Sequence, residues 1–549
     1  MSSEGHRSTA VPRLMGRGMT MGDQLARHAR KIPDAVAFTF DDVSLTYRQM
    51  DDRVSRLAGA LRDRGVAPGE RIAVLGLNAL EVIEAFIAAT RLGAVCVPLN
   101  FRLVADEIAY MLADSGAAAV VVHAPLAATM TKARSRVGGV RTSLVFGADG
   151  PVAADDGEDY ERALAEAPPE FPERDDGGTS HGRPGRGGEG DAAFIMYTSG
   201  TTGRPKGAVL THHNLLMHAF SSMVHNGVQP DDQVWLAAAP LFHIAGLSGM
   251  LPTLLNGGRT VLLPSGRFDP AETVGLMERE RVSSVFLVPA QWQAIVSVPD
   301  IAARDLSALH RLSWGAAPAP TTLLRTMIDM FPQAEVATAF GQTECSPVTC
   351  VLRGEDSIRK IGSVGTPMLN VEARVVDDDM SDVPRGEVGE IVYRGPTVMR
   401  EYWNKPEATA EAFRGGWFHS GDLVREDEDG YYYVVDRKKD MIISGGENIY
   451  CAEVEDVLAA HPKVGEVALI GMPDEKWGET PLAVLAPRDA DDPPTPADIE
   501  AWCLDRLARY KRPRRIAVLP MLPRNPGGKI LKTDLRTARA AGELPIEPA

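Results

Sequence analysis

Residues 197–207 (YTSGTTGRPKG) gather hydroxyl side chains, glycines and one lysine, Lys206, into a single short segment. Glycines let backbone N–H groups approach an anion, hydroxyls donate to its oxygens, and a lysine adds a mobile positive charge. The segment differs from the P-loop pattern Gly-x4-Gly-Lys-Ser/Thr, because Arg204 and Pro205 separate Gly203 from the lysine. Its composition is typical of a phosphate-binding loop and also of an ordinary surface turn.

Four isolated side chains also suit binding or catalysis, and each has a plain structural alternative. Glu344 offers the hard oxygen that Mg²⁺ prefers, although a lone glutamate is more often solvated or caps a helix. Asp422 could accept two hydrogen bonds, but it follows a glycine as many surface acids do. His243 suits substrate contact or an ordinary half-buried position, and Lys529 follows two glycines in a segment typical of an exposed loop. Residue type alone leaves all four open.

The elements that would position these residues follow an α/β pattern. Apolar side chains at helical spacing predict a helix over residues 50–61, and residues 71–75 form a short β-rich run. A second cycle follows, with a helix that is lined by the apolar residues Val82, Ile83, Phe86 and Ile87 and ends at Gly93, and a strand over residues 94–97. Alternation of this kind predicts an α/β fold with a largely parallel sheet.

Composition divides the chain into segments. Residues 1–18 mix Ser, Gly, Arg and Pro without periodicity, so we expect them to be disordered. Residues 168–190 are dense in Pro, Gly and charge, which predicts a loop. Five consecutive charged residues, 436–440, lie between apolar runs and predict an exposed hinge. We therefore expect a large domain over residues 19–438 and a small one over residues 439–549.

The small domain is also predicted to be α/β. Its expected elements are a helix over residues 452–461, strands over 467–471 and 482–486, a helix over 497–510 and a strand over 516–519.

The overall composition is that of a globular protein. Of the 549 residues, 44% are hydrophobic and 24% are charged, which disfavours a disordered, collagenous or coiled-coil chain. Lys and Arg number 58 against 74 Asp and Glu, and the net charge of −16 disfavours general nucleic-acid binding. Any bound phosphate must therefore be held locally.

Cysteine usage and hydropathy bear on the compartment. The five cysteines include no Cys-x-x-Cys pair, so neither a disulfide framework nor a zinc ribbon is expected. The longest apolar stretch, residues 116–122, is far too short to cross a bilayer, and no apolar signal-peptide core follows the polar N-terminus. We expect a cytoplasmic protein, with peripheral membrane contact left open.

The complete string of residues 197–207 matches the phosphate-loop signature of the adenylate-forming superfamily, which includes acyl- and aryl-CoA ligases, peptide-synthetase adenylation domains and firefly luciferase. The other motifs of that superfamily follow in order at residues 240–243 (PLFH), 315–318 (GAAP), 340–344 (FGQTE), 417–422 (WFHSGD), 436–447 and 523–529 (PRNPGGK). The chain thus resembles the superfamily over nearly its whole length. The resemblance implies a large N-terminal adenylate-forming domain of α/β subdomains and a small mobile C-terminal α/β domain.

The resemblance also implies a role for each matching residue. It assigns ATP and AMP binding to Thr198, Ser199, Gly200, Thr201, Thr202, Gly203, Lys206, Gly315, Ala316, Ala317, Phe340, Gly341, Gln342, Thr343, Asp422, Arg437 and Lys529. It assigns the acyl pocket to His243, Leu247, Val288, Ala317 and Gly341, and the pantetheine arm of coenzyme A to Ser444, Gly445 and Gly446. Glu344 would be the Mg²⁺ ligand, Lys439 the hinge, and Lys529, Lys206, Thr343 and Glu344 the catalytic residues. The chain departs from the usual motifs at Phe340, where Tyr is common, and at Gly527, where Ser or Thr is common.

These roles imply an ATP- and Mg²⁺-dependent ligase that forms an acyl-adenylate and then an acyl-CoA. The implied pocket offers no carboxylate for an ammonium group, which disfavours an amino acid as substrate. Residues 441–450 and 474–479 most resemble bacterial medium- and long-chain fatty-acid–CoA ligases of actinobacterial type, so a fatty acid is expected. Three alternatives stay open: a hydroxycinnamate or other aryl acid, transfer of the acyl group from the adenylate to a carrier protein, and non-catalytic binding. The expected partners are small molecules, and a homodimer is also left open.

Overall fold

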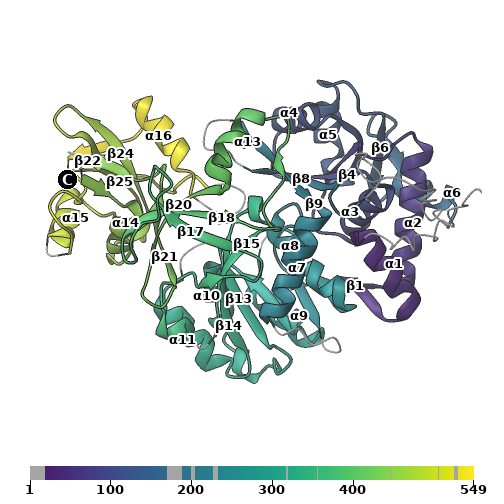
Figure 1. Cartoon of the computed structure of the whole chain (residues 1–549), viewed down its shortest axis with the longest axis horizontal. Helices are drawn as coiled ribbons and strands as arrows, with labels where there is room; N and C mark the ends of the chain where they lie inside the picture. Colours follow the sequence, from purple (N-terminus) through teal and green to yellow (C-terminus); the bar gives the residue numbers. More distant parts are fainter. Residues whose placement is uncertain are drawn as a thin grey trace, which may run out of the picture. The chain divides into compact units, whose positions relative to one another are not determined.

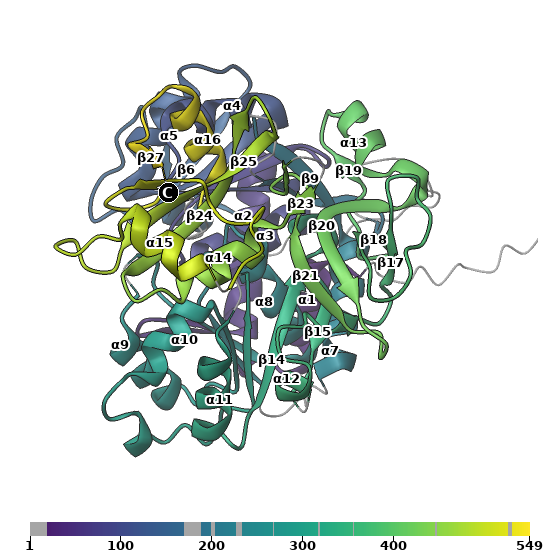
Figure 2. The same cartoon turned by 90° about the vertical axis from the view of Figure 1, so that its left-hand side faces the viewer.

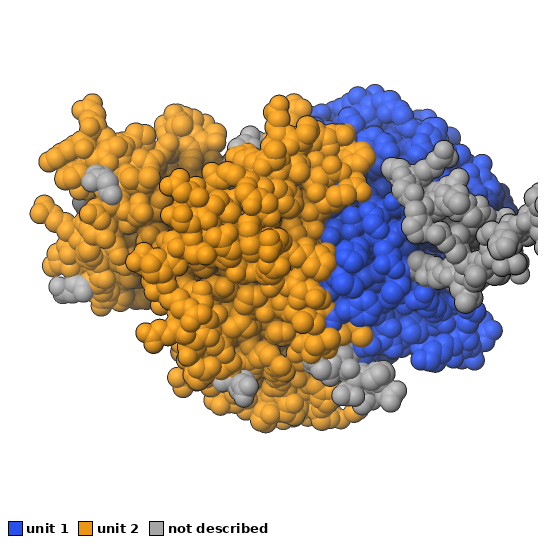
Figure 3. All heavy atoms as spheres, viewed as in Figure 1, with its two compact units in different colours: residues 1–196, 209–220, 229–265 blue, residues 197–208, 221–228, 266–549 orange. Residues whose placement is uncertain are grey.

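The computed structural model describes residues 19–169, 188–198, 204–226, 233–266, 268–316, 319–354, 356–444, 447–504, 506–524 and 530–548. The N-terminal segment expected to be disordered and most of the expected loop at 168–190 lie outside these ranges. The chain divides into two compact units (Figure 3). Unit 1 comprises residues 1–196, 209–220 and 229–265, and unit 2 comprises residues 197–208, 221–228 and 266–549.

Unit 1 contains the parallel sheet that the sequence predicted. Its strands run in the order β8-β4-β3-β5-β6-β7, and β4, β3, β5 and β6 are parallel to their neighbours. The strands are β3 (Arg71–Leu75), β4 (Val95–Leu99), β5 (Ala117–His123), β6 (Thr142–Phe146), β7 (Glu158–Asp159) and β8 (Ala192–Thr198). The helices of this region, labelled in Figure 1, are α2 (Tyr47–Asp63), α3 (Leu80–Leu92), α4 (Ala105–Ser115), α5 (Ala127–Arg134) and α6 (Tyr160–Glu166). Both predicted helix–strand cycles are confirmed, and α3 ends where Gly93 adopts a φ of 78°.

A second group of strands in unit 1 runs in the order β10-β11-β1-β2. They are β1 (Val36–Phe40), β2 (Val43–Thr46), β10 (Val234–Ala237) and β11 (Arg259–Leu262), accompanied by α1 (Met21–Lys31) and α8 (Ile244–Asn256). Strands β1 and β10 are parallel to β11. Strand β8, strand β9 (Lys206–Thr211) and helix α7 (His212–Asn226) have residues in both units.

Unit 2 contains parallel strands that end at the predicted nucleotide motifs. Strands β12 (Ser284–Leu287), β13 (Arg311–Gly315) and β14 (Glu335–Gly341) are parallel, and β15 (Val348–Leu352) and β16 (Thr366–Pro367) continue the sheet antiparallel. The helices here are α9 (Pro270–Arg279), α10 (Pro289–Val296), α11 (Thr321–Met330) and α12 (Asp356–Arg359). An antiparallel sheet follows, in the order β17 (Glu372–Val376), β18 (Val388–Arg394), β20 (Phe418–Glu426) and β21 (Tyr432–Arg437). Strand β19 (Glu401–Tyr402) and helix α13 (Pro406–Ala412) precede β20.

The C-terminal residues of unit 2 form a further sheet with helices on both faces. Its strands are β22 (Ile442–Ser444), β23 (Glu447–Ile449), β24 (Val464–Asp474), β25 (Gly478–Pro487), β26 (Arg515–Val518) and β27 (Ile546–Pro548). Its helices are α14 (Cys451–Ala459), α15 (Pro496–Cys503) and α16 (Lys532–Ala540). Alternate residues of β24 and β25 enter two separate cores, one containing α14 and α15 side chains and the other a side chain of α16. Figure 2 labels these helices and both strands. The expected α/β pattern is confirmed, whereas the boundary at residue 439 stays a prediction.

One predicted helix is wrong in length. The sequence predicted a helix over residues 497–510, and α15 ends at Cys503. The Arg512 side chain donates hydrogen bonds to the carbonyl oxygens of Leu504 and Leu507, at 2.6 and 2.9 Å. A side chain from outside the helix thus binds two carbonyl oxygens beyond its end.

The prediction that residues 436–440 are exposed as a whole is also wrong. Asp436 and Asp440 are only 6% and 8% exposed. Asp436 accepts hydrogen bonds from the backbone N–H groups of Arg437 and Cys451, and Asp440 pairs with Arg536 at 2.8 Å. Burial raises the pKa of Asp436, whereas Arg536 and Lys532 hold the pKa of Asp440 below its usual value despite burial. Lys439 between them is exposed.

All five cysteines are buried and free. Among the residues that the structure describes, no helix combines the length and apolar character that a membrane span requires.

Candidate active site

Glu344 lies in a short turn directly after β14, with most of its surface buried. Its Oε1 atom accepts hydrogen bonds from the hydroxyl groups of Tyr402, at 2.9 Å, and Thr198, at 3.3 Å. The backbone N–H of Met399 donates to the Glu344 carbonyl oxygen at 2.6 Å. Segments far apart in the sequence therefore hold one buried carboxylate in a fixed orientation.

Lys206 contacts the ring of Tyr402, the residue whose hydroxyl group donates to Glu344. Its Nζ atom is 4.5 Å from the centre of the Tyr402 ring, a cation–π geometry. The backbone N–H of Trp403 donates to the carbonyl oxygen of Gly207 at 2.7 Å and fixes this approach. Burial, and then the Glu344 charge, raise the pKa of Tyr402, so its hydroxyl stays protonated and donates. Tyr402 thus lies between a positive and a negative side chain.

This arrangement fits a magnesium ion that is bound together with nucleotide phosphates. Mg²⁺ commonly takes one or two carboxylates from the protein and its other ligands from phosphates and water. Within the described ranges, no cluster of three or more His, Cys, Asp or Glu side chains could hold a metal without help from a substrate. A single oriented carboxylate, Glu344, is the donor that such a shared site needs.

Two glycines shape the ends of the parallel strands beside this carboxylate. At Gly341, φ is 153° and an added Cβ would lie 2.0 Å from the carbonyl oxygen of Pro347. At Gly315 an added Cβ would lie 2.3 Å from the carbonyl oxygen of Ala339. Both contacts are with backbone, which cannot move away as a flexible side chain can, so each position requires glycine.

Asp422 and Arg437 face each other across the antiparallel pair β20–β21. The Arg437 Nε atom is 2.5 Å from the Asp422 Oδ1 atom, and Asp422 is 2% exposed. The Ser420 hydroxyl accepts a hydrogen bond from the Asp422 backbone N–H at 3.0 Å. These two residues, which the resemblance assigns to ATP and AMP binding, are therefore brought together as an oriented ion pair.

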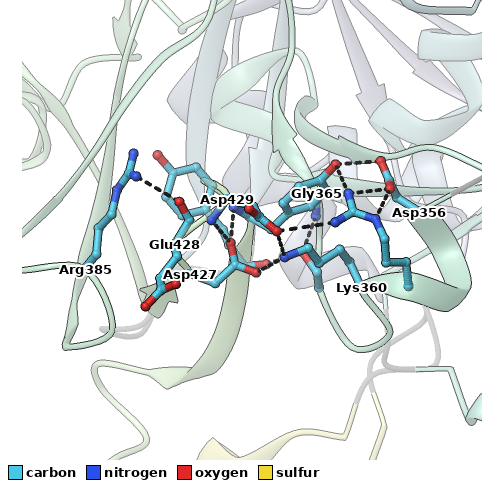
Figure 4. Close-up of polar contacts among 11 residues, drawn as sticks. Asp356, Lys360, Gly365, Arg385, Asp427, Glu428 and Asp429 are labelled. Atoms are coloured by element: carbon cyan, nitrogen blue, oxygen red, sulfur yellow. Dashed lines mark hydrogen bonds and ion pairs between the residues drawn. The ribbon is translucent and has the colours of Figure 1, made fainter.

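The turn between β20 and β21 is fixed by a network of charged side chains (Figure 4). Lys360 donates to Asp427 and Asp429 at 2.7 and 2.5 Å. Asp427 also accepts from the backbone N–H groups of Asp429 and Tyr431, and the Tyr431 hydroxyl donates to Asp356. The network ties the hairpin that carries Asp422 and Arg437 to helix α12.

Replacing Lys360 with methionine should lower the thermal unfolding midpoint at neutral pH. Its hydrogen bonds keep the pKa of Asp429 below its ordinary 3.8, and they do the same for Asp427 although burial there acts in the opposite direction. A lowered carboxyl pKa contributes stability above 3.8 that is lost as the pH falls through the lowered value. The difference in midpoint between the wild type and K360M should therefore shrink on acidification from pH 7 to below 3.8, and a difference that grows would contradict the network's role.

The motif at residues 240–243 lies in unit 1 and is held by Asn78. The Asn78 side chain donates to the carbonyl oxygens of Ala239 and Leu263, at 3.3 and 3.0 Å, and accepts from the Leu241 N–H at 2.9 Å. His243 directly precedes α8 and caps it, because its Nδ1 atom accepts a hydrogen bond from the Ala245 N–H at 3.2 Å. Asn78 is thus a positioning residue for the turn that precedes His243.

We expect Asn78→Ala to lower the free energy of unfolding by about 2–4 kcal/mol. The substitution leaves an N–H and two carbonyl oxygens without their partner in a buried position, since Asn78 is 3% exposed. Urea unfolding measures the loss. The control is Asn100→Ala, which removes one exposed hydrogen bond to the Arg102 N–H and should cost about 0.5 kcal/mol. Equal losses for the two variants would show that Asn78 does not anchor the turn.

The structure places the remaining predicted residues as follows. Thr343 and Gln342 precede Glu344, Phe340 is half-buried next to the last residue of β14, and Ala316 follows β13 with a φ of 65°. Leu247 is buried in α8, Val288 precedes α10 and Ser444 is buried at the end of β22. Ser199, Gly200, Thr201, Thr202, Gly203, Ala317, Gly445, Gly446 and Lys529 lie outside the described residues.

Tyr402 is the site residue that sequence reasoning missed. It belongs to none of the quoted motifs, and a tyrosine next to a tryptophan resembles ordinary core. Only its contacts with Glu344 and Lys206 identify it.

A buried carboxylate beside a lysine, glycines at parallel strand ends and an Asp–Arg pair together define a nucleotide-binding α/β enzyme. The chain belongs to the AMP-binding enzyme family. The family matches residues 25–403, and its C-terminal domain matches residues 453–529.

Individual relatives cover nearly the whole chain. The chain is 43% identical to a feruloyl-CoA synthase from Amycolatopsis over 95% of this chain and 99% of that protein. It is 38% identical to the long-chain-fatty-acid–CoA ligase FadD13 of Mycobacterium tuberculosis over 91% and 94%, respectively. The o-succinylbenzoate-CoA synthetase of Bacillus subtilis superposes with a TM-score of 0.82 at 31% identity in complex with the acyl-adenylate OSB-AMP, covering 93% of this chain and 97% of that one. The same enzyme with ATP and a magnesium ion gives a TM-score of 0.81 at 30% identity, with coverage of 93% and 99%.

These matches confirm the resemblance to the adenylate-forming superfamily and the α/β fold with a large N-terminal and a small C-terminal domain. They also confirm the expected enzyme class, an AMP-forming acid–thiol ligase.

Proposed function

We propose that this enzyme joins a monocarboxylic acid to coenzyme A in two steps. The carboxylate oxygen first attacks the α-phosphorus of ATP, pyrophosphate leaves, and an acyl-adenylate forms. The thiolate sulfur of coenzyme A then attacks the acyl carbon, and AMP leaves. The observation that carries the proposal is the cluster of Glu344, Tyr402 and Lys206, which offers a carboxylate for magnesium and a lysine for the phosphates of ATP.

In the first step, negative charge builds up on the α-phosphate and on the departing pyrophosphate. Lys206 offers a positive charge close to Glu344, and Thr198 and Thr343 offer hydroxyl groups beside it. Magnesium, held by Glu344 and the phosphates, would supply further neutralisation when bound. Donors that are oriented before reaction stabilise developing charge without reorganisation.

Asp422 and Arg437 would orient the ribose. Asp422 is buried and fixed by Arg437, so its carboxylate can accept from vicinal hydroxyl groups with little loss of side-chain entropy. This contact would set the position of the α-phosphate relative to the attacking carboxylate.

For the second step we propose that the small domain turns about Lys439. Lys439 is exposed between Asp436 and Asp440, which are both buried and bonded, so backbone rotation there would disturb few contacts of its own side chain. The turn would withdraw Lys529 and bring in residues 444–446, whose two glycines leave room for pantetheine.

Two classes of acid are supported. A hydroxycinnamate comes first, because the chain is 43% identical to a feruloyl-CoA synthase over nearly the full length of both proteins. A long-chain fatty acid comes second, supported by 38% identity to a fatty-acid ligase and by the similarity of residues 441–450 and 474–479 to such enzymes.

A panel of acids distinguishes these candidates. Purified enzyme receives Mg·ATP with ferulate, 4-coumarate, decanoate or palmitate, and AMP release is followed with and without coenzyme A. We expect CoA-dependent AMP release with ferulate and 4-coumarate that exceeds the release with either fatty acid at least tenfold. The reverse order would establish the fatty-acid candidate. AMP release that is stimulated by an acyl carrier protein and not by coenzyme A would overturn the proposed thiol acceptor.

A further inference from the structure

The parallel sheet of unit 1 has a topological switch point between β3 and β5. The chain leaves β3, crosses through α3 to β4 on one side, and later returns to β5 on the opposite side of β3. Loops that follow two such strands diverge and leave a crevice at their carboxyl ends, where open α/β sheets bind ligands.

A pocket of about 320 Å³ occupies this crevice. Residues 77–81 line it directly after β3, His123 ends β5, and Phe146 and Gly147 follow at the end of β6. The pocket is also lined by residues from the ends of β1 and β11, including Phe40 and Pro264. Every lining residue belongs to unit 1, and none is among those assigned to ATP, coenzyme A or the acid.

The pocket wall is mainly apolar and of a size for a small aromatic molecule. Phe40, Leu77, Leu80 and Phe146 supply apolar surface. The volume lies at the lower end of the range for ligand pockets, which disfavours a nucleotide or a long acyl chain.

Asn78 also lines the pocket, but its polar groups already form hydrogen bonds within the protein. Its backbone N–H donates to the Ser265 hydroxyl at 2.8 Å, and its side chain holds the turn before His243. His123 and Glu81 are the titratable groups that line the pocket.

The His123 ring is held in place by its neighbours. It stacks on Phe146 with ring centres 4.7 Å apart and planes at 13°. On the Cδ2–Nε2 edge, the chain passes so close at Gly147 that an added Cβ would lie 2.9 Å from both atoms. The Nδ1 atom is buried and has no hydrogen-bond partner in the described part of the chain. Because an unbonded buried N–H is costlier than an unbonded lone pair, the single N–H of the neutral ring belongs on Nε2.

Burial favours the neutral forms of His123 and Glu81. It lowers the pKa of His123 and raises that of Glu81. An imidazole N–H donates and a carboxyl group accepts, and a hydroxyl group is complementary to both because it accepts and donates. Transfer of an ionised carboxylate into a mainly apolar pocket is costly, which disfavours the acid substrate as a ligand here.

We infer that this pocket is a second ligand site, which binds a small neutral aromatic alcohol through apolar contact and hydrogen bonds to His123 and Glu81. The inference does not depend on the proposed function, because it uses no residue assigned to ligation.

The probe is 4-methylphenol, titrated into the full-length enzyme by calorimetry and by NMR of the histidine side chains. We expect saturable binding with a Kd of about 1 mM and a shift of the His123 ring resonances. Toluene lacks the hydroxyl group and therefore both hydrogen bonds, so it should bind about 25-fold more weakly. Benzoate should not shift the His123 resonances.

Two variants test the location. His123→Phe keeps the stacking surface and removes the ring nitrogens, so it should weaken 4-methylphenol binding about fivefold and leave toluene binding unchanged. Val43→Trp places a large side chain at a lining position that is 53% exposed, so folding is spared and binding of both probes should be lost. The matched control is Val104→Trp at another exposed valine of unit 1, 62% exposed and outside the pocket lining. Binding that survives in V43W, or that is displaced by Mg·ATP and the acid substrate, would overturn the inference.

Discussion

Replacing Lys529 with alanine should slow acyl-adenylate formation by a factor on the order of 10² to 10³, while the reaction of coenzyme A with supplied acyl-adenylate continues at a near-normal rate. The resemblance places this lysine between the attacking carboxylate and the α-phosphate, where a fixed positive charge offsets charge that develops during attack. The proposed rotation of the small domain removes it before the thiol reacts. The two half-reactions should therefore differ in their dependence on it, and each can be measured separately by quenched-flow chromatography.

Lys532 provides the matched control for this experiment. It lies three residues further along the chain and pairs with Glu455 at 2.8 Å within the small domain. Lys532→Ala should affect stability and reduce both half-reactions to a similar, small extent. Equal damage to both half-reactions in K529A would remove Lys529 from the first step.

Glu344→Gln should lower the rate of the first step by a factor on the order of 10² to 10³ and raise the Mg²⁺ concentration needed for half-maximal rate. Glutamine has nearly the same shape and retains a carbonyl oxygen that can accept from Tyr402 and Thr198. The substitution therefore removes the charge with little change in packing. Initial rates of ATP–pyrophosphate exchange across a magnesium titration give both quantities.

Tyr402→Phe tests the orientation of the Glu344 carboxylate without changing its charge. This variant keeps the ring beside Lys206 and removes only the hydroxyl group that donates to Glu344. Loss of one hydrogen bond that positions a ligand should reduce the rate about tenfold, with a smaller shift in magnesium dependence. If E344Q and Y402F had the same small effect, Glu344 would be a structural carboxylate and not a metal ligand.

Much of the fold could be predicted from the sequence because its signals are local. The strand predicted over residues 71–75 has those bounds in the structure, and the helix before β4 ends at Gly93, which adopts a left-handed conformation. Apolar periodicity and a terminal glycine act within a few residues of each other, so no tertiary information is needed.

The features that the sequence did not predict depend on partners distant in the chain. Five consecutive charges suggested exposure, yet Asp436 and Asp440 are buried because the Cys451 N–H and the Arg536 side chain satisfy them. The helix ending at Cys503 is shorter than its periodicity indicated, because Arg512 binds carbonyl oxygens beyond its end. Tyr402 could be identified only after folding had brought it to Glu344.

The motif residues divide in the same way. Glu344, Asp422 and Arg437 were singled out by resemblance to a known family, and no local pattern distinguishes them from surface charges. In the structure they differ from surface charges, because both acids are buried and Asp422 pairs with Arg437 at 2.5 Å.

The most direct test of the account is the stoichiometry of one reaction. Purified enzyme is incubated with Mg·ATP, coenzyme A and ferulate, and AMP, ADP, pyrophosphate and CoA thioester are quantified together. Attack at the α-phosphate followed by transfer of the acyl group to the thiol requires AMP, pyrophosphate and thioester in equal amounts and no ADP. When every acid of the panel is omitted, no AMP should form. Formation of ADP with inorganic phosphate, or AMP release that needs no acid, would contradict the proposed ligase.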